Sequence, residues 1–147
     1  MQGSRFVEPG LALLAERDAA MRQLLALALK NAGYGVRQCS NALQLKAELY
    51  SSPILTAENA LLVLNLELAA QCTVELSTLE RVRSNARSER PQFLVICEFG
   101  GVKEFSLSGV GDLRIAGVLE KPFDIDEVER IARTCRDPVR QSSGQFD

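Results

Sequence analysis

The stretch Val118–Ala132, VLEKPFDIDEVERIA, decides the fold class because an apolar run gives way within a few residues to an amphipathic helix. The run Ile115–Leu119 (IAGVL) has the length and composition of a buried strand. A Lys-Pro pair ends it, and Asp124 is a good N-cap for the helix that follows. That helix has one apolar stripe at i, i+3, i+4 and i+7, formed by Val128, Ile131, Ala132 and Cys135.

The same alternation of apolar runs and helix-period stretches extends back toward the start of the chain. Four more runs are predicted as strands: Leu11–Ala15, Val36–Cys39, Ala60–Leu64 and Phe93–Cys97. Helices are predicted over residues 18–31, 40–51 and 74–86, and glycine-rich residues 98–114 predict a distorted or mobile fourth helix. Strands that alternate with helices predict an α/β doubly wound parallel sheet, covered on both faces.

Composition narrows the range of functions. The chain has 147 residues, a net charge of -2 and no histidine. This length fits one domain, and we find no basic excess for nucleic acid and no apolar run long enough to span a membrane. The absence of histidine excludes Ser-His-Asp catalysis and histidine metal ligands. Four cysteines without zinc-ligand spacing, in a chain without a secretion signal, predict reduced, buried thiols in a cytoplasmic protein.

Polar residues follow four of the predicted strands. In a parallel sheet of this class, ligands bind beyond the carboxyl ends of the strands, so these residues mark the candidate site. The polar residues are Glu16, Arg17, Asp18, Asn65, Glu67, Glu98 and Lys121. Cys97, at the end of its strand, and Pro122, after Lys121, lie at the same edge. No glycine-rich loop follows the first strand, so dinucleotide, flavin and P-loop phosphate sites are not indicated.

Three motifs together resemble the receiver domain of two-component response regulators. They are LLAERDAAMRQLL (residues 13–25), NAGYGV (residues 31–36) and the stretch VLEKPFDIDEVERIA already quoted, which is the most specific. The resemblance covers residues 11–137 and implies a flavodoxin-like (βα)5 sheet of order 2-1-3-4-5, with flexible ends at residues 1–10 and 138–147. It also implies a cis bond between Lys121 and Pro122. We expect no output domain after Asp137.

The resemblance also implies a site. In receivers an aspartate after the third strand accepts a phosphoryl group. Two acids after the first strand help it to hold Mg²⁺, while a hydroxyl residue and a lysine bind the phosphoryl oxygens. An aromatic residue on the fifth strand then changes orientation. The corresponding residues of this chain are Glu16 and Arg17 for the two acids, Asn65 for the acceptor, Cys97 for the hydroxyl, Lys121 for the lysine and Val118 for the aromatic.

These residues depart from the receiver pattern where the chemistry takes place. Asn65 has an amide instead of an ionised carboxylate, and Arg17 brings a cation where a metal ligand is expected. One acid, two cations and an amide give Glu16, Arg17, Asn65 and Lys121 a formal charge of +1, so we expect Mg²⁺ binding to be absent or weak. Cys97 is only a weak donor and is expected to pack in the core, with a redox thiol as the alternative. The sequence therefore predicts a degenerate phosphorylation pocket without catalytic residues, a pseudo-receiver.

Several alternatives stay open at this point. Asp18 could supply the second acid, Glu67 could accept a phosphoryl group, and a ligand sensor could be built on the same fold. Without phosphate, Lys121 is expected to form an ion pair with Glu16 or Glu67. Arg17 is expected to act as a built-in cation that holds the acidic loops.

The leading interpretation is a non-enzymatic signalling module of a two-component or phosphorelay-type pathway that acts independently of phosphorylation. Its expected partner is another signalling protein or a second copy of the chain, as a monomer or weak homodimer, and neither nucleic acid nor a membrane is expected. Receivers bind partners through their fourth helix, fifth strand and last helix. The partner-binding residues expected there are Val102, Phe105, Leu113, Val118, Phe123, Glu127 and Arg130.

Overall fold

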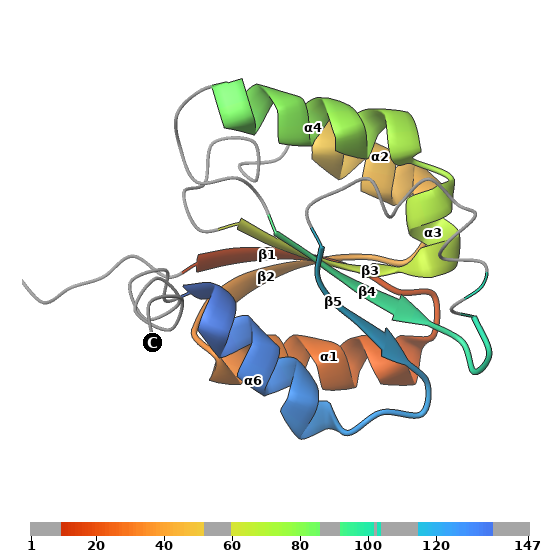
Figure 1. The fold of residues 1–147 in the computed structure, drawn as a ribbon, viewed down its shortest axis with the longest axis vertical. Helices are drawn as coiled ribbons and strands as arrows, with labels where there is room; N and C mark the ends of the chain where they lie inside the picture. Colours follow the sequence, from red (N-terminus) through yellow and green to blue (C-terminus); the bar gives the residue numbers. More distant parts are fainter. Residues whose placement is uncertain (1–9, 52–59, 86–91, 102, 104–114, 137–147) are drawn as a thin grey trace, which may run out of the picture.

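The computed structural model describes residues 10–51, 60–85, 92–101, 103 and 115–136 (Figure 1). The described residues form strands and helices that alternate along most of the chain. The strands are β1 (Gly10–Ala15), β2 (Tyr34–Cys39), β3 (Ala60–Asn65), β4 (Gln92–Cys97) and β5 (Ile115–Glu120). The helices are α1 (Ala19–Asn31), α2 (Ala42–Ser51), α3 (Leu66–Ala70), α4 (Thr73–Asn85) and α6 (Ile125–Arg136).

The five strands form one sheet of order β2-β1-β3-β4-β5, in which every neighbouring pair is parallel. The predicted strand order and fold class are confirmed, and β2 is an edge strand as expected. Because all strands run in the same direction, their carboxyl ends meet at one edge of the sheet. This edge carries the residues that follow each strand.

Helices cover both faces of the sheet. Helices α1 and α6 lie on one face, and α2, α3 and α4 lie on the other (Figure 1). Successive strand residues point to opposite faces, so Leu13 and Leu62 belong to the core under α2 and α4, while Leu14 and Leu61 belong to the core under α1 and α6. All six residues of β3 are buried, as a central parallel strand requires.

Each strand is one or two residues longer than predicted, and the differences at β1 and β2 concern the starts of the strands. The segment assigned to a flexible N-terminus included Gly10, which is buried and begins β1. Strand β2 begins at Tyr34, two residues earlier than predicted, because Tyr34 and Gly35 pair with Gly10 and Leu11 of β1. The buried Tyr34 hydroxyl donates a hydrogen bond to the carbonyl of Ala132 at 2.8 Å. A tyrosine ring can be buried at a strand end when its hydroxyl has a hydrogen-bond partner. A search for aliphatic runs does not detect such a strand end.

The region after β4 is only partly described. The predicted distorted helix over residues 98–114 falls mainly on residues outside the described part of the chain, as do the predicted flexible ends at residues 1–9 and 138–147. The predicted cis bond between Lys121 and Pro122 is confirmed. Within the described ranges, no helix combines the length and apolarity that a membrane span needs.

The cysteines agree with the packing interpretation. Cys39, Cys72, Cys97 and Cys135 are all free thiols and all buried. Burial raises the pKa of Cys39 to about 11 and also raises the pKa of Cys72. A buried thiol with a raised pKa stays protonated and unreactive, which fits a core residue.

Candidate functional site

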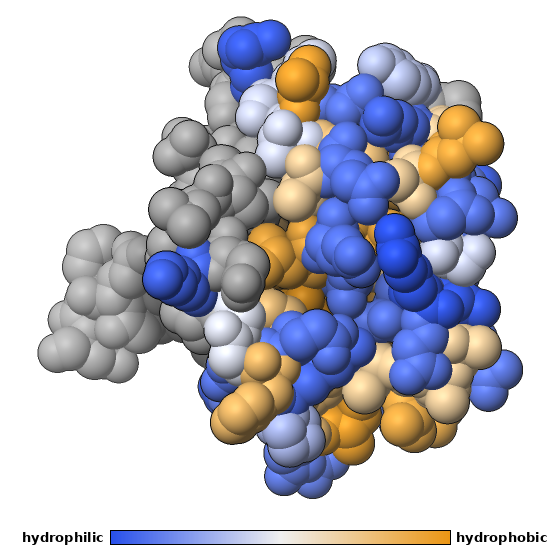
Figure 2. Space-filling view, turned by 90° about the vertical axis from the view of Figure 1, so that its right-hand side faces the viewer, coloured by the Kyte–Doolittle hydropathy of each residue, from blue (hydrophilic) through white to orange (hydrophobic). Residues whose placement is uncertain are grey.

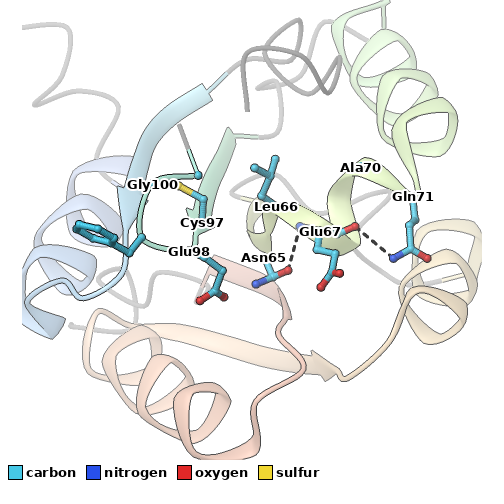
Figure 3. Close-up of a pocket in the computed structure, with 10 residues that line it drawn as sticks. Asn65, Leu66, Glu67, Ala70, Gln71, Cys97, Glu98 and Gly100 are labelled. Atoms are coloured by element: carbon cyan, nitrogen blue, oxygen red, sulfur yellow. Dashed lines mark hydrogen bonds between the residues drawn. The ribbon is translucent and has the colours of Figure 1, made fainter. Parts of the chain in front are cut away.

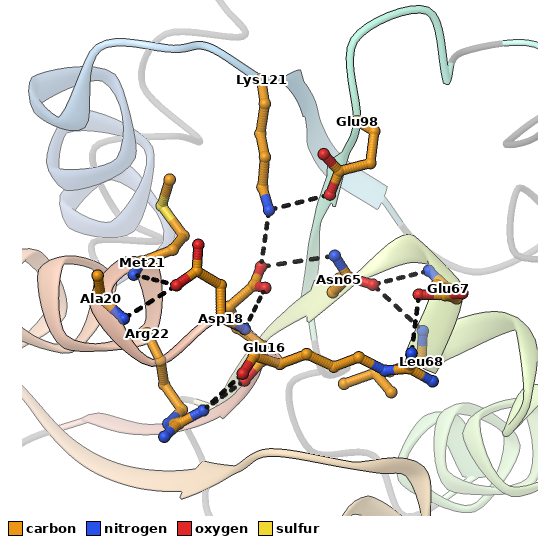
Figure 4. Close-up of polar contacts among 11 residues, drawn as sticks. Glu16, Asp18, Ala20, Met21, Arg22, Asn65, Glu67, Leu68, Glu98 and Lys121 are labelled. Atoms are coloured by element: carbon orange, nitrogen blue, oxygen red, sulfur yellow. Dashed lines mark hydrogen bonds and ion pairs between the residues drawn. The ribbon is translucent and has the colours of Figure 1, made fainter.

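Glu16 is the centre of the polar cluster at the carboxyl edge of the sheet (Figure 4). It follows β1 directly and is only 2% exposed. Its Oε2 accepts the backbone N–H of Asp18 at 3.0 Å, and its Oε1 accepts the side-chain amide of Asn65 at 3.5 Å. The same Oε1 lies 3.4 Å from Nζ of Lys121. A buried carboxylate is stable only with such partners, and here both of its oxygens have them.

Asn65 ends β3 and begins the short helix α3. Its Oδ1 accepts the backbone N–H groups of Glu67 at 3.0 Å and of Leu68 at 3.4 Å, which makes it the N-cap of α3. With its oxygen engaged by the helix, Asn65 turns its NH₂ group toward Glu16 as a donor. An aspartate would place a second negative charge beside a buried glutamate at this position.

Lys121 is the cation of the cluster. Its side chain is 17% exposed, and Nζ lies 3.4 Å from Glu16 and 3.0 Å from Oε2 of Glu98. Its backbone N–H donates to the carbonyl of Cys97, which holds the lysine beside the end of β4. Burial lowers the pKa of Lys121, but the hydrogen bond to Glu98 and the attraction of both carboxylates outweigh it, so the pKa is raised. Lys121 therefore stays charged.

The expected pairing of Lys121 with Glu16 is confirmed, but Glu67 is not its partner. Glu67 instead lies 3.4 Å from Arg17 in an ion pair whose two side chains are 53% and 65% exposed. Arg17 thus links the loop after β1 to α3 on the surface, and its role as a built-in cation stays a prediction. Exposed pairs of this kind contribute little to stability.

The predicted formal charge of +1 counted Arg17, which pairs with Glu67 on the surface, and left out Glu98, which contacts Lys121. The cluster that the structure brings together contains Glu16, Glu98, Lys121 and Asn65, and its formal charge is -1. Sequence reasoning placed Glu98 at the correct sheet edge but did not identify it as a partner of Lys121. No group of three potential metal ligands occurs within the part of the chain that the structure describes.

Asp18 has a different role from the metal ligand considered as an alternative. Its Oδ1 accepts the backbone N–H of Ala20 at 3.0 Å and of Met21 at 3.5 Å, so it is the N-cap of α1. Arg22 reaches back across this turn and donates to the carbonyl of Glu16 at 2.8 Å. These contacts fix the backbone that carries Glu16.

A pocket of about 580 Å³ lies next to this cluster (Figure 3). Its walls are α3 with its N-cap and the turn at residues 97–101, which follows β4. Cys97 is 1% exposed and lines the pocket from the end of β4. Viewed from this edge of the sheet, the surface is largely hydrophilic, with an apolar strip near its middle (Figure 2).

The predicted partner-binding residues are only partly described. Val118 packs against the core under α2 and α4, whereas Phe123 packs against the core under α1 and α6. Glu127 and Arg130 form an ion pair on the surface of α6. Val102, Phe105 and Leu113 lie outside the described residues. The partner-binding role of all seven stays a prediction.

Comparisons with known proteins identify the fold. No family model matches the chain, and no curated protein matches it. Among solved structures, the receiver domain of AraT from Geobacillus stearothermophilus matches with a TM-score of 0.62 and 14% identity, over 93% of this chain and 99% of that one. The signal receiver domain of a putative LuxO repressor protein from Vibrio parahaemolyticus matches with a TM-score of 0.60 and 14% identity, over 93% and 96%.

Full-length FixJ from B. japonicum also matches, with a TM-score of 0.60 and 22% identity over 94% of this chain. This chain spans 64% of the length of FixJ. The protein therefore has the fold of response-regulator receiver domains, as the three sequence motifs predicted. Its residues at the carboxyl edge of the sheet then define what this particular receiver fold can do.

Proposed function

We propose that this chain is a receiver-fold signalling module that acts by binding another protein and is not itself phosphorylated. Asn65 supports this proposal most directly. Its amide occupies the end of β3, caps α3 through Oδ1 and donates to Glu16 through Nδ2. An amide has no negative charge with which to attack a phosphoryl donor. This inference starts from fold-level analogy and depends on the chemistry of the site.

The charge pattern supports the same proposal. Lys121, which would bind a phosphoryl group in a receiver, is already neutralised by Glu16 and Glu98. An incoming phosphoryl group would have to displace the Glu98 carboxylate and would lie close to Glu16. Negative charges this close repel one another in a partly buried site.

The residues present do not fit Mg²⁺. Mg²⁺ requires several oxygen ligands in near-octahedral geometry at about 2.0–2.1 Å. Both carboxylate oxygens of Glu16 accept hydrogen bonds, Asn65 presents an NH₂ group, and the Lys121 cation is 3.4 Å away. We therefore propose that Mg²⁺ binding is absent or weak.

The partner and the setting are part of the proposal. We infer a non-enzymatic role in a two-component or phosphorelay-type pathway, in the cytoplasm. The partner is another signalling protein or a second copy of the chain, and the chain is a monomer or weak homodimer. The receiver fold supports this assignment because the solved structures that share it are signalling domains.

Incubation with acetyl phosphate and Mg²⁺, followed by intact-mass measurement, tests the proposal. We expect no phosphoryl adduct on the parent chain and no heat of Mg²⁺ binding by calorimetry. A stoichiometric adduct on the parent would overturn the proposal. Loss of that adduct in Glu67→Gln would assign the alternative acceptor, whereas Glu48→Gln, remote from the site on α2, serves as the matched control.

A further inference from the structure

The pocket beside the polar cluster has the size of a binding site. Its volume of about 580 Å³ falls within the range of about 300–1,000 Å³ that is usual for ligand pockets. Leu66 and Ala70 form one wall on α3, and Cys97 and the following turn form the other. The walls are therefore mainly apolar, and an apolar group can be buried between them.

The turn after β4 is tightly built. Gly101 donates its N–H to the carbonyl of Glu98 at 2.8 Å, and Gly100 has φ +81°, a conformation that favours glycine. Gly100 also donates to Oε2 of Glu120, at 2.5 Å. A Cβ added at Gly101 would lie 2.8 Å from the Glu98 carbonyl, so a side chain has no room there. Both glycine N–H groups are therefore engaged and are not available to an anion.

The rim of the pocket is acidic. Glu67 and Glu98 line it, and no cationic side chain does so among the described residues. Arg17 and Lys121 reach these carboxylates from outside the pocket, and each contacts a single oxygen. Figure 3 shows the carboxylates of Glu67 and Glu98 on one side of the pocket and Leu66 on the other. This arrangement fits a group with an apolar body and a positive charge beside it.

Phe99 indicates a protein rather than a small molecule as the occupant. It lines the same pocket, and 84% of it is exposed. A small ligand is usually buried within its pocket, whereas aromatic side chains exposed beside a pocket are typical anchors of protein interfaces. Contact with Phe99 requires a partner that extends beyond the pocket itself.

We propose that this pocket binds an apolar side chain of a partner protein that is flanked by lysine or arginine. The apolar side chain enters between Leu66 and Cys97, the flanking cation lies against Glu67 and Glu98, and Phe99 packs on the neighbouring part of the partner. This inference rests on the proposed function and adds the chemistry of the partner. It places the contact on α3 and the turn after β4.

Selection of short peptides from a random display library against the full chain tests the inference. We expect enriched peptides with an apolar residue next to lysine or arginine. Their affinities are then measured by fluorescence polarisation against the parent, Phe99→Ser and Ala70→Arg, the second of which fills the pocket and adds a positive charge beside its acidic rim. Each variant should bind at least about tenfold more weakly. Leu43→Ser, which removes an apolar side chain 78% exposed on α2, is the matched control and should bind like the parent.

The outcomes separate this inference from the proposed function. The selected peptides could bind the Phe99→Ser and Ala70→Arg variants as tightly as the parent but lose affinity for Arg130→Glu on α6. That result would overturn the proposal that the pocket binds the partner, and it would leave a protein-binding function intact. Enrichment of acidic peptides, or of none, would also overturn it. So would saturable binding of free 2-phenylethylamine in the pocket without any peptide, since that result favours a ligand sensor. Thermal unfolding confirms that each variant is folded, and the phosphorylation assay tests the proposed function independently.

Discussion

Replacing Lys121 by methionine removes the only cation that pairs with the Glu16 carboxylate among the described residues, while it keeps most of the apolar volume of the side chain. Glu16 is 2% exposed and its Oε1 lies 3.4 Å from the lysine nitrogen. The substitution leaves a buried carboxylate without its counter-ion. We expect a loss of stability that the exposed ion pairs of this protein do not show.

The size of the loss follows from the contacts that remain. Removing one partner of a fully buried ion pair costs about 3–5 kcal/mol. Glu16 keeps the Asp18 N–H at 3.0 Å and the Asn65 amide at 3.5 Å, which lowers the expected loss to about 2–3 kcal/mol. The lost contact with Glu98 adds at most about 0.5 kcal/mol, because the Glu98 side chain is 71% exposed.

Urea denaturation measures this loss of free energy, and thermal unfolding measures the change in melting temperature, both followed by circular dichroism. The melting temperature should fall by about 6–12 °C, given roughly 3–4 °C per kcal/mol for a domain of this length. Lys30→Met, an exposed lysine in the last turn of α1, is the matched control and should change stability by less than about 0.5 kcal/mol.

A double-mutant cycle with Glu16→Gln isolates the pair. When the carboxylate is neutral, losing the lysine costs less, so we expect a coupling energy of about 1–2 kcal/mol between the two positions. The reasoning would be refuted by a Lys121→Met variant that is no less stable than Lys30→Met. Strictly additive effects in the cycle would refute it as well.

Three further predictions concern single residues. Asn65→Ala should lose about 1–2 kcal/mol of stability in urea denaturation, because it removes the α3 cap and a donor to Glu16. The control Asn41→Ala, whose Oδ1 accepts the N–H of Gln44 near the start of α2, should lose about 1 kcal/mol. Equal losses would contradict the role of Asn65 in the cluster. Arg17→Ala should change stability by less than about 0.5 kcal/mol in the same assay because its ion pair is exposed, and a loss above about 1.5 kcal/mol would show that it does hold the loops. Burial raises the pKa of Cys39 to about 11, so the thiol ionises at lower pH in the unfolded chain than in the folded one. Stability should therefore fall as the pH rises from about 8.5 to 11. Cys39→Ala should reduce this fall, and an unchanged dependence of stability on pH would argue against the role of Cys39.

The structure changes how the departures from the receiver pattern are explained. Asn65 was expected only to lack a nucleophile, but it also caps α3 and donates to Glu16. Glu98 supplies a negative charge to Lys121 from the turn after β4. The charged groups of the cluster are thus satisfied by one another and by the Asn65 amide.

Local sequence patterns determined the strands, most helices, the strand order through the receiver resemblance, and the buried state of the four cysteines. Short apolar runs are typical of strands that are buried on both faces, as in a parallel sheet covered by helices, and this pattern can be recognised in the local sequence. Asn65 could also have been identified as a helix cap, because asparagine before Leu66–Ala70 matches the residue preference at that position. The helix was missed because it is too short for apolar periodicity to show.

Only the tertiary structure decided which charges meet. Arg17 and Glu16 are neighbours in sequence, yet Arg17 points to Glu67 on the surface while Glu16 is buried beside Lys121. Ion pairing depends on side-chain direction and on the relative position of loops that are distant in the chain, and neither is encoded in residue spacing. The pocket between α3 and the turn after β4 has the same origin, since its two walls come from separate segments that the sheet brings together.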